Sequence, residues 1–405
     1  MKLTDLEKSG KTLAATELIK AKCFWDKVLF SRRYFGHLVP LAFSPYHVEL
    51  LDAVSPRMRG VARADAAPRG SGKTSLRTIE IIHDVVFKEY YEALGLVPND
   101  YIVIVCETDD AVYERMDDIQ AELETNSLLR ADFGDLVGRT WGHQRVITKN
   151  DVCIVAKSRG ARIRGLLYRG RRPRKILISD VQKSQNISSP TVREKDLEWF
   201  QSDVRRAGDN QGIMNTIVEG TILHKDALVG VLRRNPAFTG KTYQAIDSWS
   251  DRPDLWEEWK RIYTDLQHDD RKDRARRFYE EHETEMLRGV ALLWPEGLDY
   301  YRCQEQIVSD GMSAFLKEMQ QQPYDPEKAL FKMDKAIRFD VQAEGVLRDD
   351  GRLVRWKDFT GMSMFLDWAG GKDSIDNCFA CCPVILWEAF PGGSQSYAYL
   401  VDVWM

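Results

Sequence analysis

The sequence lacks any long uninterrupted run of apolar residues and any N-terminal segment of the signal-peptide kind. A membrane-crossing helix needs about 20 consecutive apolar residues, so we expect neither a membrane span nor secretion by that route. Cysteine is scarce, and the seven present do not form the two Cys-X-X-Cys pairs of a zinc ribbon, which favours a reducing compartment. A strong charge of one sign is missing too, because the formal net charge is −4. A surface for a polyanion must therefore be a local patch.

The 405 residues are enough for two domains. Residues 1–60 show helical spacing of apolar side chains. Residues 61–322 alternate short apolar runs with helical segments, which predicts an α/β fold with a doubly wound, mainly parallel sheet. Residues 323–360, with two prolines and mixed charge, are typical of a linker or connecting subdomain. Residues 361–405 begin a second α/β unit, which we expect to be truncated or shortened, because the sequence stops before that unit can close a core.

The expected strands are short and rich in β-branched residues. After the apolar run that ends at residue 66, they cover 101–106, 152–156, 175–180, 213–220 and, less regularly, 242–246. Further strands are expected at 362–367 and 397–403. From 254 to 322 the spacing is helical, and a stripe that includes Trp256, Trp259 and Leu266 predicts a packed core on one face.

One stretch has the composition and context of a phosphate-binding loop. It stands between the first strand and a helical segment and reads Ala67-Pro68-Arg69-Gly70-Ser71-Gly72-Lys73-Thr74. Such a turn directs backbone N–H groups at a polyphosphate, and the following helix adds partial positive charge. The spacing is that of a P-loop with Ala67 in place of the first glycine. It predicts ATP binding, with Lys73 on the β and γ phosphates and the Thr74 hydroxyl on Mg²⁺.

A P-loop also needs a carboxylate at the end of a neighbouring strand. Asp180 ends the stretch Ile176-Leu177-Ile178-Ser179-Asp180, and we assign it to Mg²⁺ or to a metal-bound water. The next side chains in line for a catalytic base are amides, Gln182 and Gln185, and an amide cannot accept a proton. The site is therefore expected to bind ATP better than it hydrolyses it.

A basic run lies between the third and fourth expected strands. Its members are Arg159, Arg162, Arg164, Arg169, Arg171, Arg172, Arg174 and Lys175. Such a run is either a solvated face, a contact for a DNA backbone, or the source of an arginine finger that acts on a neighbour's γ-phosphate. Arg164 is our candidate for the finger, and Arg69, inside the loop, could act in the same way within one chain.

Three other residues are candidates for nucleotide contacts. Tyr46 and His47 precede the loop at a distance suited to clamping an adenine, although they could equally cap and pack a helix. Thr221 ends the strand 213–220 beside the expected phosphate site, where a hydroxyl can sense the γ-phosphate.

Carboxylates in the last segment suggest a second metal site. Two-metal nucleases gather several carboxylates around two divalent ions. Asp367 at the end of one expected strand and Asp402 in the strand that we expect beside it could begin such a cluster, with Mg²⁺ or Mn²⁺ as the metal.

The order of these parts resembles the large terminase subunit, the DNA-packaging motor of tailed bacteriophages, over most of the chain. The resemblance is carried by the loop 67–74, by 176–180, by Val218-Glu219-Gly220-Thr221, by Leu293-Trp294-Pro295-Glu296 and by residues 315–323 with their Gln-Gln-Gln-Pro end. Residues 364–373 look like the first strand of the family's RNase H-like nuclease. Two positions depart from the pattern: Ser179 stands where a first Asp is frequent, and Gln182 where an acid is common.

The resemblance implies an ATPase that drives double-stranded DNA into a procapsid and an endonuclease that cuts concatemeric genomes. It also implies a portal protein, a small terminase subunit and further copies of the chain in a ring as partners, in the cytoplasm of an infected bacterium and away from any membrane. Two alternatives stay open: a helicase or translocase without a nuclease, and a nucleotide-binding switch that does not hydrolyse ATP.

Overall fold

A computed structural model describes residues 15–183, 186–323, 339–349, 351–359, 361–364, 382–389 and 396–404. The chain divides into two compact units, residues 1–325 and 326–405. Among the described residues, no helix is long and apolar enough to cross a membrane.

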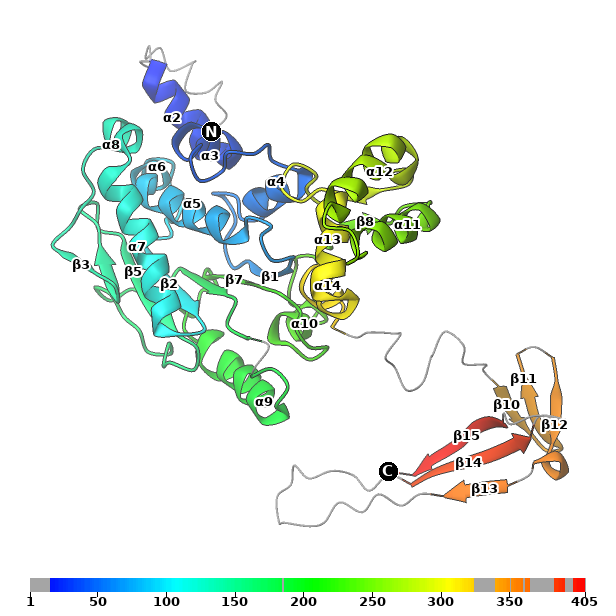
Figure 1. The fold of residues 1–405 in the computed structure, drawn as a ribbon. Coiled ribbons are helices and arrows are strands. Elements are labelled where there is room, and N and C mark those ends of the chain that lie inside the picture. Colours follow the sequence, from blue (N-terminus) through cyan, green and yellow to red (C-terminus); the bar gives the residue numbers. More distant parts are fainter. Residues whose placement is uncertain are drawn as a thin grey trace. The chain divides into compact units, whose positions relative to one another are not determined.

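The first unit is built on a seven-stranded sheet with the order β1-β7-β6-β2-β5-β4-β3 (Figure 1). Five neighbouring strands are parallel: β1 (Ala62–Ala66), β7 (Asn215–Gly220), β6 (Lys175–Ser179), β2 (Tyr101–Cys106) and β5 (Cys153–Ser158). The short strands β4 (Arg145–Ile147) and β3 (Thr140–Gly142) add an antiparallel edge. The predicted mixed α/β fold with a mainly parallel sheet is therefore confirmed.

Helices cover this sheet and precede it. They are α2 (Ala15–Trp25), α3 (Lys27–Tyr34), α4 (Pro45–Asp52), α5 (Lys73–Val86), α6 (Lys88–Ala93), α7 (Asp109–Thr125), α8 (Ser127–Phe133), α9 (Pro190–Trp199), continued by a π-helical turn (Phe200–Val204), and α10 (Leu228–Arg233). Within the region 1–60 that was expected to be helical, α2 and α3 are separate helices because Asp26 caps α3 by accepting a hydrogen bond from Leu29 N.

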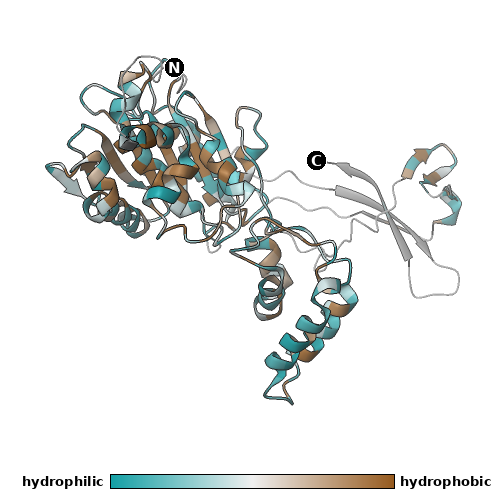
Figure 2. Cartoon of the chain, turned by 90° about the horizontal axis from the view of Figure 1, so that it is seen from above, coloured by the Kyte–Doolittle hydropathy of each residue, from teal (hydrophilic) through white to brown (hydrophobic). Residues whose placement is uncertain are grey.

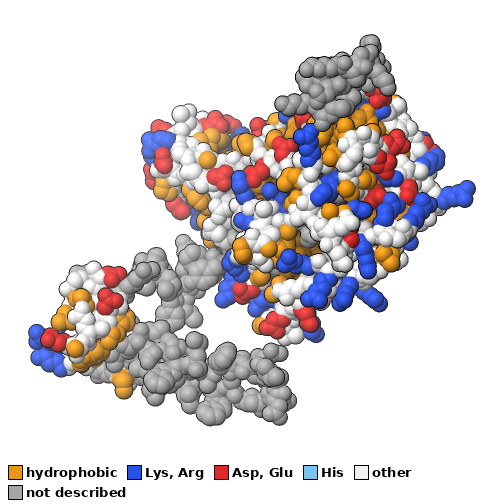
Figure 3. Space-filling view, turned by 180° about the vertical axis from the view of Figure 1, so that it is seen from behind, with side chains coloured by type: hydrophobic (Ala, Val, Ile, Leu, Met, Phe, Trp, Pro, Cys, Tyr) orange, Lys and Arg blue, Asp and Glu red, His pale blue; other side chains and the backbone are white. Residues whose placement is uncertain are grey.

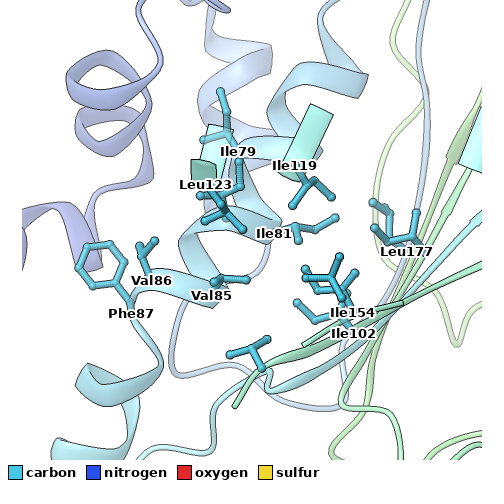
Figure 4. Close-up of a cluster of buried hydrophobic side chains, with 14 of the residues drawn as sticks. Ile79, Ile81, Val85, Val86, Phe87, Ile102, Ile119, Leu123, Ile154 and Leu177 are labelled. Atoms are coloured by element: carbon cyan, nitrogen blue, oxygen red, sulfur yellow. The ribbon is translucent and has the colours of Figure 1, made fainter. Parts of the chain in front are cut away.

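The sheet separates two hydrophobic cores. On one face, side chains of α5 and α7 meet alternate residues of the strands, among them Ile102, Ile154 and Leu177 (Figure 4). On the other face, Val103 and Ile178 pack with Trp199 and Phe200. Strands that are apolar on both faces must be central and covered, which the continuous β-branched runs predicted. Figure 2 shows the apolar segments concentrated in these layers.

The segment from 244 to 319 forms a helical part of the same unit. It contains β8 (Ile246–Ser248), α11 (Pro253–Tyr263), α12 (Arg271–Met286), β9 (Ala291–Leu292), α13 (Tyr300–Asp310) and α14 (Met312–Glu318). Trp256 and Trp259 are buried in its core, as predicted, but Leu266 is 80% exposed, so its assignment to the core was wrong. Leu266 lies beyond the end of α11, where the helical period no longer applies.

The strand expected at 242–246 does not form over those residues; the regular strand there is β8, which begins at Ile246. Residues 239–243 run along the free edge of β1, where Ala64 N donates to Thr239 O (3.0 Å) and Tyr243 N donates to Ala66 O (2.8 Å). Only isolated bridges form there, and the regular strand β8 pairs with β9 instead.

The second unit contains two antiparallel sheets in its described residues. One joins β10 (Phe339–Gln342), β11 (Gly345–Arg348) and β12 (Leu353–Arg355), and the other joins β13 (Gly361–Met364), β14 (Cys382–Ala389) and β15 (Ser396–Trp404). The strand carrying Asp402 was expected beside the strand that starts near 362. That expectation was wrong, because β14 pairs with both and separates them.

Candidate functional site

The glycine-rich turn connects β1 to α5 at the carboxyl end of the parallel strands. Gly70 and Gly72 have positive φ angles of 70° and 81°, and Gly72 is the N-cap of α5. These angles suit glycine, because a Cβ atom would be strained there. The turn is stiffened by Ser71 Oγ, which donates to Pro68 O (2.8 Å). The backbone N–H groups at the start of α5 can therefore face an anion.

Lys73 lies in this turn with its ammonium group drawn inward. Its Nζ atom donates to Ala67 O (3.1 Å) and to Pro68 O (3.0 Å), and the residue is buried. Thr74, the next residue, is exposed, and its carbonyl accepts a hydrogen bond from Arg115 Nη1 (2.6 Å). The first turn of α5 therefore carries a buried cation at Lys73 and an exposed hydroxyl-bearing residue at Thr74.

Tyr46 and His47 lie beneath the turn and support it. Tyr46 OH is 3.0 Å from Ser71 Oγ, and His47 Nε2 is 3.0 Å from Ser71 O. Burial lowers the pKa of His47, so the ring is neutral; Nε2 then donates to Ser71 O while Nδ1 accepts from Ser44 N (3.0 Å). Both side chains are buried in this arrangement. Their contact with an adenine stays a prediction.

Thr221 contacts the turn from the end of β7, and Asp180 lies at the end of β6, the next strand of the sheet. Asp180 follows β6 with a φ of 46°, unusual for a residue with a side chain, and it is exposed. Its Oδ1 atom lies 3.6 Å from the point that a Cβ on Gly220 would occupy. Thr221 Oγ1 donates to Ala67 O (3.4 Å), and Ala67 N donates to Gly220 O (3.0 Å).

The strand order sets the width of the gap between Asp180 and the turn. β7 alone separates β6 from β1, and neighbouring strands are about 4.8 Å apart, so the two backbones lie roughly 10 Å from each other. A hydrated Mg²⁺ fits such a gap, since this ion is usually held by one or two protein oxygens, by phosphates and by water. Among the described residues, no three His, Cys, Asp or Glu side chains form a metal-binding group.

Both polar atoms of the Gln182 side-chain amide form hydrogen bonds. Nε2 donates to Asp196 Oδ2 (2.7 Å), and Oε1 accepts from Leu228 N (2.7 Å). Arg159 Nη1 contacts the same oxygen of Asp196 at 3.3 Å. Gln182 thus joins the loop after β6 to α9 and α10. Gln185 lies outside the described residues.

Arg69 and Arg164 occupy different places. Arg69 Nε forms an ion pair with Glu318 Oε2 (2.6 Å) at the end of α14, and its side chain remains 60% exposed. Arg164 lines a cavity of about 1150 Å³.

Arginines from two distant segments form the walls of this cavity. The lining residues are Gly160, Arg162, Arg164, Gly165, Arg172, Asp203, Arg205, Arg206, Gly208, Asp209 and Asn210. Four of the five arginines are exposed. Sequence reasoning missed Arg205 and Arg206, although they form a basic pair directly after the π-helical turn. Figure 3 shows basic side chains at several places on the side of the molecule opposite the view of Figure 1.

Other members of the basic run are held by acids instead. Arg169 pairs with Asp151 (2.9 Å), and Arg171 pairs with Asp151 (2.9 Å) and with Asp100. Those arginines fix the loop between β5 and β6 and are less available to a ligand.

The metal site expected at Asp367 and Asp402 in the second unit stays a prediction. Asp367 lies outside the described residues. Asp402 lies in β15, paired with Val384, and its side chain is outside the description.

Comparison with known proteins gives matches among solved structures only: no family model and no curated protein matches the chain. The large terminase of bacteriophage HK97 aligns with 96% of this chain and 68% of its own length, at 13% identity and a TM-score of 0.41. The ATPase domain of the large terminase of Thermus phage P74-26 aligns with 62% of this chain and 97% of its own, at 16% identity and a TM-score of 0.32. A mutant of that domain aligns with 57% and 92%, at 13% identity and the same score.

The chain is thus similar to solved structures of phage large terminases, the family that its motifs resemble.

Proposed function

We propose that this protein is an ATP-driven DNA-packaging motor subunit of the large-terminase type. The observation that carries the proposal is the turn 67–74 at the start of α5, which has two glycines at positive φ. One strand, β7, lies between the strand that leads into this turn and the strand that ends at Asp180. A triphosphate would lie on the backbone N–H groups of Gly70 to Thr74. Pro68 and Arg69 would form its outer edge.

Each residue of the site has a role in this proposal. Lys73 would exchange the carbonyls of Ala67 and Pro68 for the β and γ phosphates, which carry more charge. The Thr74 hydroxyl and the Asp180 carboxylate would hold Mg²⁺, which neutralises charge on the phosphates. Thr221, bonded to the turn through Ala67 O, would respond to the γ-phosphate.

The basic cavity supports a polyanionic partner. Arg162, Arg164, Arg205 and Arg206 are exposed, and arginine pairs with phosphate through two parallel hydrogen bonds. Double-stranded DNA is the partner that we propose for this surface. In a ring of copies, Arg164 would instead act on the γ-phosphate bound by a neighbouring copy.

Nucleotide turnover tests the proposal. We expect ATP hydrolysis that rises when linear duplex DNA is added, measured for the chain itself and for Gln182→Glu. If neither protein hydrolyses ATP and DNA has no effect, the motor proposal fails. A helicase without a nuclease would in addition unwind a forked duplex.

DNA binding tests the cavity separately. The variant Arg205→Ala/Arg206→Ala should weaken duplex binding by about 10-fold and flatten its salt dependence, because each phosphate contact contributes to the salt slope. Lys272→Ala/Arg277→Ala on α12 removes two exposed cations that do not line the cavity and serves as the control. Equal affinities for the two double variants would contradict the assignment.

The endonuclease part of the proposal is supported by the amino-acid sequence alone. Asp367 and Asp402 would start a Mg²⁺ or Mn²⁺ site in the second unit. The portal protein, the small terminase subunit, a ring of copies and the cytoplasm of the infected host complete the proposal.

One observation favours a second candidate, a nucleotide-binding switch that does not hydrolyse ATP. Gln182 stands where a catalytic acid is common, and its amide is engaged by Asp196 and Leu228. Tight ATP binding without turnover, in the chain and in Gln182→Glu alike, would favour the switch over the motor.

A further inference from the structure

A cluster of buried charges lies between α5 and the sheet, directly behind the candidate phosphate turn. It includes Arg77, Glu80, Asp84, Lys175, Asp65, Glu219 and Lys27, each at most 3% exposed. Arg77 is at its centre: Nε contacts Glu219 Oε2 (3.0 Å), Nη1 contacts Glu80 Oε2 (2.6 Å) and Nη2 contacts Asp65 Oδ2 (3.4 Å). At the far end, Lys175 Nζ bridges Asp84 (2.6 Å) and Glu80 (2.7 Å).

The near end of the cluster lies at the carboxyl ends of three strands. Asp65, Glu219 and Ser179 are register partners across β1, β7 and β6, so their side chains leave the sheet on the same face. Ser179 Oγ donates to Glu219 Oε1 (2.9 Å). The next peptide is held by the same residue, because Asp180 N donates to Glu219 O (3.0 Å). Glu219 therefore holds both the last residue of β6 and the residue after it.

The other side of Glu219 leads to the turn. Arg77 follows Lys73 by four residues on α5, so both lie on one face of the helix that the turn begins. A continuous path of bonds runs from Lys73 along one helical turn to Arg77, then to Glu219, Ser179 and Asp180. Its two ends are the proposed phosphate ligand and the proposed metal ligand.

Stability alone does not account for this cluster. Burying charges costs free energy that ion pairing often fails to repay, and well-packed apolar side chains of similar size are frequently as stable or more so. A buried ion pair whose carboxylate oxygens all accept hydrogen bonds does, however, hold the bonded side chains in one position. Asp180 needs such fixing, because its φ of 46° is unfavourable for a residue with a side chain.

We propose that Glu219, held by Arg77, is a positioning residue that fixes Asp180 relative to the phosphate turn. The inference rests on the proposed function. Ser179, where the terminase pattern has an acid, serves here as the hydroxyl through which Glu219 acts.

Glu219→Gln tests this with a matched control. It keeps the shape of the side chain and removes its charge, and Asp84→Asn makes the same exchange at the far end of the cluster, where no bond to Ser179 exists. Glu219→Gln should lower kcat for ATP by about 10- to 100-fold, because small displacements of a catalytic group cost that much. Its KM and its affinity for a fluorescent ATP analogue should stay within about twofold of the wild-type values, whereas the Mg²⁺ concentration for half-maximal rate should rise.

Asp84→Asn should lower stability and leave kcat close to the wild-type value. Equal kcat values for the two variants would overturn the proposal, as would a loss of nucleotide affinity in Glu219→Gln that matches its loss of kcat. If Glu219→Gln does not fold, Ser179→Ala removes only the hydroxyl that Glu219 holds; it should lower kcat by about 10-fold, and an unchanged kcat would overturn the inference.

Failure of the proposed function has a different signature. If the wild-type protein binds no ATP analogue, the site itself is wrong. If it binds and hydrolyses ATP while Glu219→Gln and Ser179→Ala are unaffected, only the positioning role fails.

Discussion

Gln182 shows how a single amide can be tied to its surroundings rather than left open to a ligand. Its Nε2 atom faces a carboxylate oxygen of Asp196, which is itself buried. A carboxylate at position 182 would face that oxygen with a like charge at hydrogen-bond distance. The amide is therefore the side chain that this pocket accommodates best at neutral pH.

We predict that Gln182→Glu lowers the free energy of unfolding by roughly 1–3 kcal/mol at pH 7, because a hydrogen bond becomes a repulsion. The double variant Gln182→Glu/Asp196→Asn restores a donor facing an acceptor and should recover most of the loss. Urea denaturation of the three proteins measures this. A double variant no more stable than Gln182→Glu would show that the contact does not set the preference.

His83 is a buried neutral histidine whose titration should be visible in stability. Burial lowers the pKa of its imidazole to about 3, and Nε2 donates to Cys23 O (3.3 Å) and Phe24 O (3.2 Å). In the unfolded chain an imidazole takes up its proton near pH 6.5, whereas in the folded protein it resists protonation. The unfolded state thus binds more protons between these values, and stability falls as the pH drops from about 6.5 towards 3.

His83→Gln should therefore flatten the dependence of stability on pH below about 6.5, by at most about 1.4 kcal/mol per pH unit. Denaturation midpoints between pH 5 and 7 would show the difference; parallel curves for His83→Gln and the wild type would contradict it.

At the scale of elements, the end of α14 joins the helical part to the sheet. Gln320 is 1% exposed, and its amide holds both backbone groups of Ile246: Nε2 donates to Ile246 O (2.9 Å), and Oε1 accepts from Ile246 N (2.9 Å). Gln321 accepts from Ile222 N (2.8 Å), in the loop after β7. The glutamines before Pro323, which contribute to the resemblance to large terminases, therefore hold backbone groups of β8 and of the loop after β7 in place.

Gln320→Ala should cost about 2–4 kcal/mol, because it leaves a buried N–H and a buried carbonyl of β8 unpaired. Gln322→Ala removes an exposed amide and is expected to be close to neutral. Hydrogen exchange at Ile246 should speed up in the first variant only. Similar exchange in both would mean that β8 is held by other contacts.

The elements that sequence reasoning located well are those whose signal is local. The strand at 101–106 is a continuous apolar run, and the strand at 175–179 contains the apolar residues 176–178; such runs favour a covered parallel strand. The hairpin of β3 and β4 was missed because strands of three residues carry too little pattern. The strand expected at 242–246 was placed wrongly because the pairing of residues 239–243 depends on the unpaired edge of β1, which no local pattern reveals.

In the molecule as a whole, the candidate site also has parts that a local sequence pattern predicts and parts that only the fold brings together. The turn 67–74 could be recognised from eight consecutive residues. The buried cluster could not, since Arg77 and Glu219 are 142 positions apart in the sequence and meet only because β7 lies between β1 and β6. The basic cavity likewise combines two segments about 40 residues apart, and the sequence predicted only the first of them.

A titration of the whole protein with a fluorescent ATP analogue in Mg²⁺ tests whether a nucleoside triphosphate binds the turn 67–74. We predict saturable binding that falls by at least about 10-fold in Lys73→Ala, because a charge-assisted contact to phosphate is lost. Lys260→Ala, at an exposed lysine of α11, should bind as the wild type does. Absence of binding by the wild type, or equal affinity for Lys73→Ala and the wild type, would contradict the account.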